Sequence, residues 1–303
     1  NIHTIARICN PDYTDQVYKM QKTFALSLTV NPEKQAAIEI ERLLKFPGFL
    51  KRDSFAKGRV EIVELRVDER SRLCNVALSE LNRVIKCRVL ICAVLRRGDV
   101  VAPDGSFVLR EGDRIFVTAS TESLATLLDN LGIITKKVNH VMICGGGRVS
   151  YYLAQQLEKD GMTVRLIEKD PKHCEELAAL LPKTEIINDD ASNTFVLKRE
   201  NIESCDALVT ATGMDELNMI ISLYGTKHGV SQVITKLGHM ENGSMIDQLP
   251  IGSTIWPKDL CCNGIVRYIR AMHNQTGAAV SVHSIADGKA EAIEFHVEEK
   301  KPY

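Results

Sequence analysis

Two features between residues 145 and 168 have the residue types and the spacing to hold a nucleotide. Gly145-x-Gly147-x-x-Ser150 fits the dinucleotide-binding fingerprint, with serine in place of the third glycine. The first glycine permits a tight turn from strand to helix, and the second lets the backbone approach a phosphate. Glu168 follows Gly145 by 23 residues (168 − 145), close to the spacing of about 20 expected for a ribose-binding carboxylate. The motif predicts nucleotide binding; the alternative is a turn kept for packing, or an empty site.

The elements around this turn are those that the chemistry requires. Residues 141–144 form a short apolar strand, residues 145–150 the turn and residues 151–160 a helix, which Gly161 ends. Residues 164–168 form the next strand. The free N–H groups and the positive dipole end at the start of such a helix are suited to phosphate oxygens.

The alternation of strands and helices continues to residue 236. Because helices of this length separate the strands, the sequence predicts right-handed crossovers and a parallel sheet. Ligands of such sheets bind at the carboxyl ends of the strands. The predicted helices cover residues 171–181, 194–201 and 216–228, and the predicted strands cover residues 184–188, 207–211 and 232–236.

Further candidate residues follow the predicted strands. Arg148 lies inside the loop, where its guanidinium could bind a phosphate with two hydrogen bonds, or it is a solvated surface residue. Asp189-Asp190 follows the third strand, near the expected adenine or ribose, or forms an ordinary polar turn. Residues 210–212 end the fourth strand beside the crevice, or are core residues. The candidates that follow from the residues themselves are Gly145, Gly147, Arg148, Glu168, Asp190 and Thr212.

The segment from Arg59 to about Thr118 has a different pattern. Residues 60–67 alternate apolar and charged side chains, which is typical of a half-buried antiparallel strand. The sequence adds a short helix near residues 76–81, a turn at Arg97-Gly98-Asp99, and a helix over residues 121–131 capped by Ser120 or Thr121. Strands are predicted over residues 88–96, 100–102 and 114–117, which together indicate a small α+β domain.

The chain also repeats itself. Residues 32–45 match residues 257–270 at an offset of 225 (257 − 32), and residues 60–67 match residues 290–297 at an offset of 230 (290 − 60). Residues 4–7 match residues 233–236 in the same order. The repeat predicts two tandem copies of a Rossmann-like domain followed by a small α+β domain, and both ends of the chain look truncated relative to that unit.

Composition narrows the class of protein. Lys and Arg (38) nearly balance Asp and Glu (39), which argues against a nucleic-acid partner. No apolar run approaches the roughly 20 residues of a membrane span, and no signal peptide is recognisable, so we expect an intracellular protein. The nine cysteines form no CxxC pair and are interpreted as reduced thiols, with Cys261-Cys262 the only pair worth testing for another role.

Several of these segments resemble a known family. ICGGGRVSYYLAQQLE (143–158), LIEKD (166–170), NDDASN (188–193) and TATGMDELNMIISLYGTKHG (210–229) resemble the RCK_N (KTN) domain of Trk-type potassium-uptake regulators. NPEKQAAIEIERLLKFPG (31–48) resembles the crossover helix of that family, and GRVEIVELRV (58–67) the start of its RCK_C domain. The tandem repeat is similar to that of the TrkA family of peripheral regulatory subunits. The family often has Gly-Asp-Ala where this chain has Asp189-Asp190-Ala191, and the extra charge is expected to weaken or re-select the phosphate ligand.

The resemblance implies fold class, ligands and partners. It implies an α/β chain whose RCK_N parts are residues 1–57 and 138–274 and whose RCK_C parts are residues 58–137 and 275–303. It implies binding of NAD or NADH, or of ATP or ADP, without catalysis. The contact residues that it implies are Gly145, Gly147, Arg148, Val149, Glu168, Asp190, Ala191, Thr212 and Asp215. It implies a dimer or a tetrameric ring, peripheral on the inner, cytoplasmic face of the cell membrane. There it would gate a Trk-type potassium transporter of the TrkH/TrkG kind. The competing interpretations are an NAD-dependent dehydrogenase, and a soluble nucleotide sensor without a membrane partner.

Overall fold

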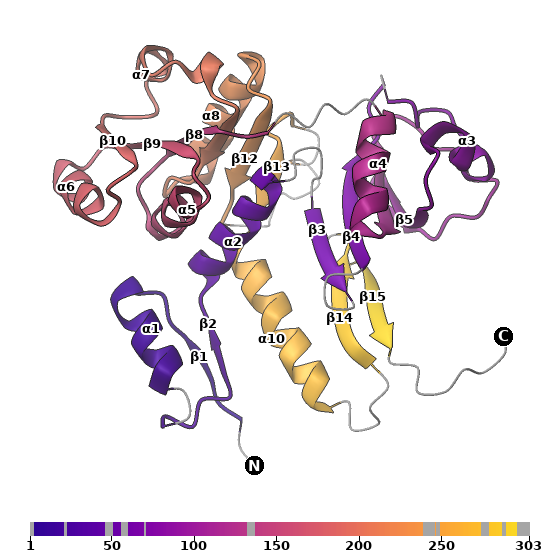
Figure 1. Ribbon diagram of the computed structural model, residues 1–303, viewed down its shortest axis with the longest axis horizontal. Helices are drawn as coiled ribbons and strands as arrows, with labels where there is room; N and C mark the ends of the chain where they lie inside the picture. The colour runs from indigo at the N-terminus through magenta and orange to yellow at the C-terminus, as the bar shows by residue number, and fades with distance from the viewer. Residues whose placement is uncertain are drawn as a thin grey trace. The chain divides into compact units, whose positions relative to one another are not determined.

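The computed structural model describes residues 3–20, 23–45, 51–55, 60–69, 71–131, 137–238, 246, 249–273, 279–286 and 289–295 (Figure 1). These residues fall into two compact units. One combines residues 1–47 with residues 136–265, and the other combines residues 48–135 with residues 266–303. The four predicted domain ranges divide the chain by repeat rather than by compactness, and they stay predictions.

The first unit contains a six-stranded sheet in which every pair of neighbours is parallel, as predicted. Its order is β10-β9-β8-β11-β12-β13, so the direction of winding reverses between β8 and β11. The carboxyl ends of these two strands define the switch point at which such sheets bind ligands. The strands are β8 (His140–Cys144), β9 (Thr163–Glu168), β10 (Glu185–Asn188), β11 (Ala207–Thr210), β12 (Gln232–Lys236) and β13 (Ser253–Ile255).

Helices cover both faces of this sheet, because alternate residues of the apolar strands point to opposite sides. Val141 and Ile143 pack in the cluster that includes α5 (Arg148–Lys159) and α6 (Pro171–Leu180). Met142 and Cys144 pack in the cluster on the other face. The second face is covered by α7 (Thr194–Arg199) and α8 (Asp215–Lys227).

Two helices around this sheet have a boundary that differs from the prediction by two residues or more. The helix predicted to begin at residue 151 begins at Arg148, because Gly147 is already its N-cap. The helix predicted over residues 194–201 ends at Arg199, because Asn201 adopts a left-handed conformation with φ of 56°. Gly161, with φ of +75°, ends its helix as predicted. The first correction matters for function, since it moves the start of α5 onto the glycine loop.

The structure confirms the internal repeat. Strand β1 (Ile5–Arg7) pairs in parallel with β2 (Leu28–Val30), as β12 pairs with β13. The registers correspond, since Ile5 lies opposite Leu28 and Ile234 lies opposite Ser253. A proline helix follows each pair, and β2 and β13 themselves were not predicted. The first copy also contains α1 (Pro11–Met20), and the two proline helices are α2 (Pro32–Lys45) and α10 (Pro257–His273).

Helix α2 of the first copy packs on α5 of the second. Its apolar residues Ala36, Ile40 and Leu44 are buried in the same cluster as Leu153 of α5. Polar contacts join the two copies as well. The side-chain amide of Asn31 donates to the hydroxyl of Tyr152 at 3.2 Å; two further contacts are Gln232 Nε2 to the Leu43 carbonyl at 2.7 Å and the ion pair of Lys45 with Asp160 at 2.9 Å. The helix behind the glycine loop is therefore held by the other repeat.

The second unit contains a five-stranded antiparallel sheet in the order β3-β4-β7-β5-β6. The predicted helix near residues 76–81 lies later, as a 3₁₀ turn (Leu78–Glu80) followed by α3 (Leu81–Ile85). Ser120 caps α4 (Thr121–Leu131), since its hydroxyl accepts from the amide of Ser123 at 3.3 Å. The strands are β3 (Lys51–Phe55), which was not predicted, β4 (Val60–Arg66), β5 (Leu90–Arg96), β6 (Asp99–Val101) and β7 (Arg114–Ala119).

A hairpin of β14 (Ala279–Ile285) and β15 (Ala290–Phe295) completes this unit. Ile285 and Ala286 join a cluster with Phe116 of the larger sheet. Strand β15 begins the repeated segment 290–297, whose last two residues lie outside the described ones. None of the helices in the described ranges combines the length and the apolar character that crossing a membrane would need.

Candidate functional site

The glycine loop follows β8 and presses against the end of β11. Gly145 has φ of +98°, and a β-carbon built on it would lie 2.8 Å from Cα of Thr212. A β-carbon on Gly146 would lie 2.7 Å from Cδ1 of Leu177. Gly147 differs, because a β-carbon built on it would lie 4.0 Å from its nearest neighbour, the Ala211 carbonyl oxygen. Contact with the backbone therefore requires glycine at residue 145, and a side chain at residue 146 would have to displace Leu177. The missing side chain of Gly147 leaves open space at the start of α5.

The start of α5 has backbone donors without a cap. Its N-cap Gly147 has no side chain to accept them, whereas Asp170 caps α6 and Asn193 caps α7, each at 3.0 Å. The first amide to bond back along the helix is that of Tyr151, to the Gly147 carbonyl at 3.0 Å. The amides of Arg148, Val149 and Ser150 precede it and are available to an anion. The Val149 side chain is buried, so only its amide could bind a ligand.

Arg148 and Ser150 have opposite environments on this first turn. The Arg148 side chain is exposed and has no ion-pair partner within the described part of the chain. A guanidinium in this position can reach a phosphate at the helix start without breaking an existing pair. Ser150 is fully buried, and its hydroxyl has no hydrogen-bond partner among the residues that the structure describes. Ser150 occupies the third glycine position of the fingerprint, where a small residue lets the helix and the strand pack closely, as predicted.

Glu168, at the end of β9, is held in front of the loop by backbone amides. Its Oε2 accepts from the amide of Gly146 at 2.7 Å, and its Oε1 accepts from the amides of Lys169 and Asp170, each at 2.9 Å. A carboxylate offers about four acceptor positions, so one remains for a hydroxyl group of a ligand. Its predicted contact with ribose stays a prediction.

Two residues at this loop, Gly146 and His173, were not predicted to belong to the site. Nε2 of His173, in the first turn of α6, lies 2.9 Å from the Gly146 carbonyl oxygen, and Nδ1 lies 3.0 Å from Oε2 of Glu176. The hydrogen bond to Glu176 is the main cause that raises the pKa of His173 above its ordinary value, and the Gly146 carbonyl and Glu168 add to it. A histidine near the start of the second helix was the only signal in the sequence.

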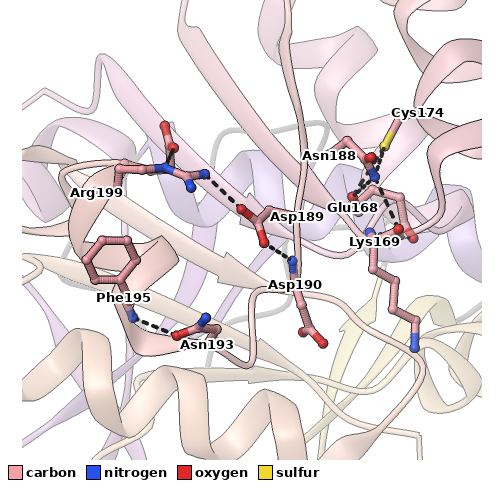
Figure 2. Close-up of polar contacts among 10 residues, drawn as sticks. Glu168, Lys169, Cys174, Asn188, Asp189, Asp190, Asn193, Phe195 and Arg199 are labelled. Atoms are coloured by element: carbon pink, nitrogen blue, oxygen red, sulfur yellow. Dashed lines mark hydrogen bonds and ion pairs between the residues drawn. The ribbon is translucent and has the colours of Figure 1, made fainter.

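The extra acid of Asp189-Asp190 is neutralised by a residue that the sequence analysis did not single out. Oδ2 of Asp189 pairs with Arg199 of α7 at 2.9 Å, and its Oδ1 accepts from the Asp190 amide at 2.8 Å (Figure 2). The Asp190 carboxylate extends away from that pair and accepts from the Ser192 amide at 2.8 Å. That hydrogen bond, the Ser192 hydroxyl and the charge of Lys169 hold the pKa of Asp190 below its ordinary value.

The remaining candidates have structural partners. Ala191 is buried in the core on the α7 side, so its methyl group packs against the protein. The Thr212 hydroxyl donates to Oδ1 of the fully buried Asn218 at 2.7 Å, and Nζ of Lys236 donates to the Thr212 carbonyl at 2.6 Å. Asp215 accepts from the Gly238 amide at 2.8 Å. Thr212 thus braces the end of β11 against which Gly145 packs, and Asp215 joins the start of α8 to the residue two positions after β12.

The arrangement fits a dinucleotide at the switch point of the sheet. The uncapped amides of α5, the open space at Gly147 and the unpaired Arg148 suit a pyrophosphate, and Glu168 lies across the loop with an acceptor position to spare. Asp190 lies at the end of the next strand outward. Gly145, Gly147, Arg148 and Glu168 come together, whereas Val149 and Ala191 contribute packing and backbone.

Comparison with known proteins identifies both kinds of domain. Residues 141–257 match the family model of the TrkA-N domain, and residues 62–132 match that of the TrkA-C domain. The Trk system potassium uptake protein TrkA of Haemophilus influenzae is 30% identical over 296 residues, a match that covers 96% of this chain. The chain spans 63% of the length of that relative.

Solved structures share the fold at lower identity. The crystal structure of the GsuK RCK domain has a TM-score of 0.61 at 16% identity, and the match covers 93% of this chain and 60% of that one. The GsuK channel bound to NAD has a TM-score of 0.59 at 16% identity, over 93% of this chain and 50% of the channel. At this identity the likeness establishes a common architecture.

Proposed function

Because the chain belongs to the family of proteins that combine TrkA-N with TrkA-C domains, we propose that it is a nucleotide-binding regulatory subunit of Trk-type potassium uptake. The observation that carries the proposal is the open space at Gly147, beside the uncapped start of α5 and the unpaired Arg148. Protein packing gives no reason for glycine at that residue, whereas a phosphate that approaches the backbone does. The NAD bound to the GsuK channel, which has the same fold, supports NAD or NADH as the ligand, with ATP and ADP as competitors.

Each site residue has a defined part in this proposal. Arg148 and the amides of α5 bind the phosphates, and Gly145 and Gly147 let the backbone come close. Glu168 binds a hydroxyl group of the ribose, which favours NAD over NADP because a 2′-phosphate would meet its negative charge. Asp190 lies beside the adenosine half. The proposal assigns no catalytic step to the chain, and we expect no turnover of NADH with small carbonyl compounds.

Calorimetric titration of the purified chain with NAD, NADH, ATP and ADP tests the ligand. We expect saturable binding of NAD or NADH, and a loss of about tenfold or more in affinity in Arg148→Ala, since a charge-assisted bidentate contact contributes roughly 1.5–3 kcal/mol. Arg110→Ala is the matched control, because Arg110 is an exposed arginine of the other unit. Equal affinities of the two variants, or no binding of any of the four nucleotides, would refute the assignment.

The membrane partner requires its own experiment. We propose that the chain acts at the cytoplasmic face of the membrane, as a dimer or a ring, on a Trk-type potassium transporter of the TrkH/TrkG kind. Co-purification with such a transporter, and a change in potassium flux on adding NADH to proteoliposomes that contain both, are the expected results. An unrelated multi-span membrane protein is the control. Nucleotide binding without co-purification would favour a soluble sensor instead.

A further inference from the structure

We propose that His173 is a positioning residue for the glycine loop and that its imidazolium form tightens the binding of a phosphate-bearing ligand. The proposal rests on the nucleotide binding proposed above. It makes the affinity for the nucleotide depend on pH, through a side chain that does not itself have to touch the ligand.

The geometry around the imidazole ring requires two protons. Nε2 lies 2.9 Å from the carbonyl oxygen of Gly146, and Nδ1 lies 3.0 Å from a carboxylate oxygen of Glu176. A carbonyl oxygen and a carboxylate oxygen are both acceptors, so only the doubly protonated ring donates to both. A neutral ring loses one of the two bonds and places a lone pair against an acceptor. Deprotonation therefore loosens the link between α6 and the loop.

The Gly146 carbonyl is a sensitive point of the loop. It belongs to the same planar, trans peptide unit as the Gly147 N–H, so the two groups point in opposite directions. Fixing the carbonyl toward His173 therefore points the Gly147 amide away from His173. The other side of Gly146 is also held, since its own amide donates to Glu168 at 2.7 Å. Glu168 and His173 together set the orientation of the loop beside the open space at Gly147.

The charges around His173 favour its protonated form. Glu176 of α6 and Glu168 of β9 are the charged groups that act on the ring, and both are acidic. Together with the Gly146 carbonyl they outweigh burial and raise the pKa of His173 above its ordinary value of 6.5. The protonated state is thus present into the pH range near neutrality. There the imidazolium adds one positive charge beside a site for an anion.

The sign of the pH effect follows. Affinity is highest when His173 is protonated, and it falls as the pH rises through the raised pKa of His173. Because the side chain is 39% exposed, the charge is partly screened, and we expect a change of about two- to fivefold between the two limits. NAD is the suitable probe, because its pyrophosphate bridge does not change charge near neutral pH, unlike the terminal phosphates of ATP and ADP.

The test is calorimetric titration with NAD from about pH 5.5 to about pH 8.5, a range that spans the ordinary histidine pKa of about 6.5. Wild type should bind more weakly at the alkaline end. His173→Gln should bind NAD with the same affinity at every pH, equal to the weaker affinity of wild type at alkaline pH. Its amide can still donate to the Gly146 carbonyl but cannot gain a proton. His173→Arg should bind NAD at every pH with the higher affinity that wild type shows at acidic pH. His140→Gln, at the opposite end of β8, is the matched control and should keep the wild-type pH dependence.

A second variant guards against misfolding of the first. Glu176→Gln removes one of the two acids that act on His173, so the midpoint of the pH dependence should move to lower pH. Thermal unfolding of each variant verifies that it is folded. NAD binding that is independent of pH in wild type, or the same pH dependence in His173→Gln, would overturn this inference alone. Absence of NAD binding at every pH would overturn the proposed NAD site instead.

Discussion

The Glu168 carboxylate holds the glycine loop through the amide of Gly146, at 2.7 Å. The same carboxylate accepts from the amides of Lys169 and Asp170, so three backbone donors depend on one side chain. Glu168→Gln should destabilise the protein by about 1–3 kcal/mol, because its NH₂ group must face one of these donors. It should also weaken NAD binding. Urea unfolding and calorimetry measure the two effects, with the exposed Glu111→Gln as control. A variant as stable as wild type would show that the amides have other acceptors.

Gly145 and Gly147 should respond differently to substitution. Gly145→Ala places a β-carbon 2.8 Å from Cα of Thr212, on a backbone with φ of +98°, so we expect a loss of about 1–3 kcal/mol in the free energy of unfolding. Gly147→Val should cost less, about 0.5–1 kcal/mol, because its β-carbon would lie 4.0 Å from the nearest atom, the Ala211 carbonyl oxygen, and the remaining cost is that of a poorer N-cap residue. The added side chain should abolish NAD binding. A Gly147→Val protein that binds NAD normally would contradict the placement of the phosphates.

Arg199 should protect the site from the negative charge of Asp189. Removing it leaves Asp189 unpaired at the carboxyl edge of the sheet, so Arg199→Ala should weaken NAD binding by about two- to fivefold. Asp189→Gly alone should change the affinity for NAD little. The double variant Asp189→Gly with Arg199→Ala should recover most of the affinity that Arg199→Ala loses. A calorimetric double-mutant cycle measures the coupling. Additive losses would mean that the pair does not influence the ligand.

The cysteine thiols should differ in their rate of chemical labelling according to how deeply each is buried. Cys262 is exposed on α10, whereas burial raises the pKa of both Cys144 and Cys205 to about 12. In the folded protein a maleimide reagent at mildly alkaline pH should therefore modify Cys262 first and leave Cys144 and Cys205 unmodified. Mass spectrometry of the labelled peptides reads the order. Labelling of Cys144 as fast as Cys262 would show that the end of β8 opens readily.

Local patterns in the sequence were sufficient for the architecture. The spacing of Gly145, Gly147 and Glu168 and the alternation of apolar strands with helices predicted a parallel sheet with a loop at one edge. The matching segments predicted the repeat that the registers of β1 with β2 and β12 with β13 confirm. These features follow from periodicity and backbone sterics, which act over a few residues and can be seen in the letters themselves. Strands β2 and β13, each three residues long, were not predicted.

Contacts between distant segments depended on the folded chain. His173 meets Gly146, Arg199 meets Asp189, and α2 packs on α5, because strand order and crossovers bring together residues that no local pattern relates. The start of α5 at Arg148 likewise depends on how Gly147 is oriented where the loop meets the end of β11. Neighbours in the chain decided which elements form. Only packing across the sheet decided which charges and donors surround the loop, because electrostatic and steric contacts act through space.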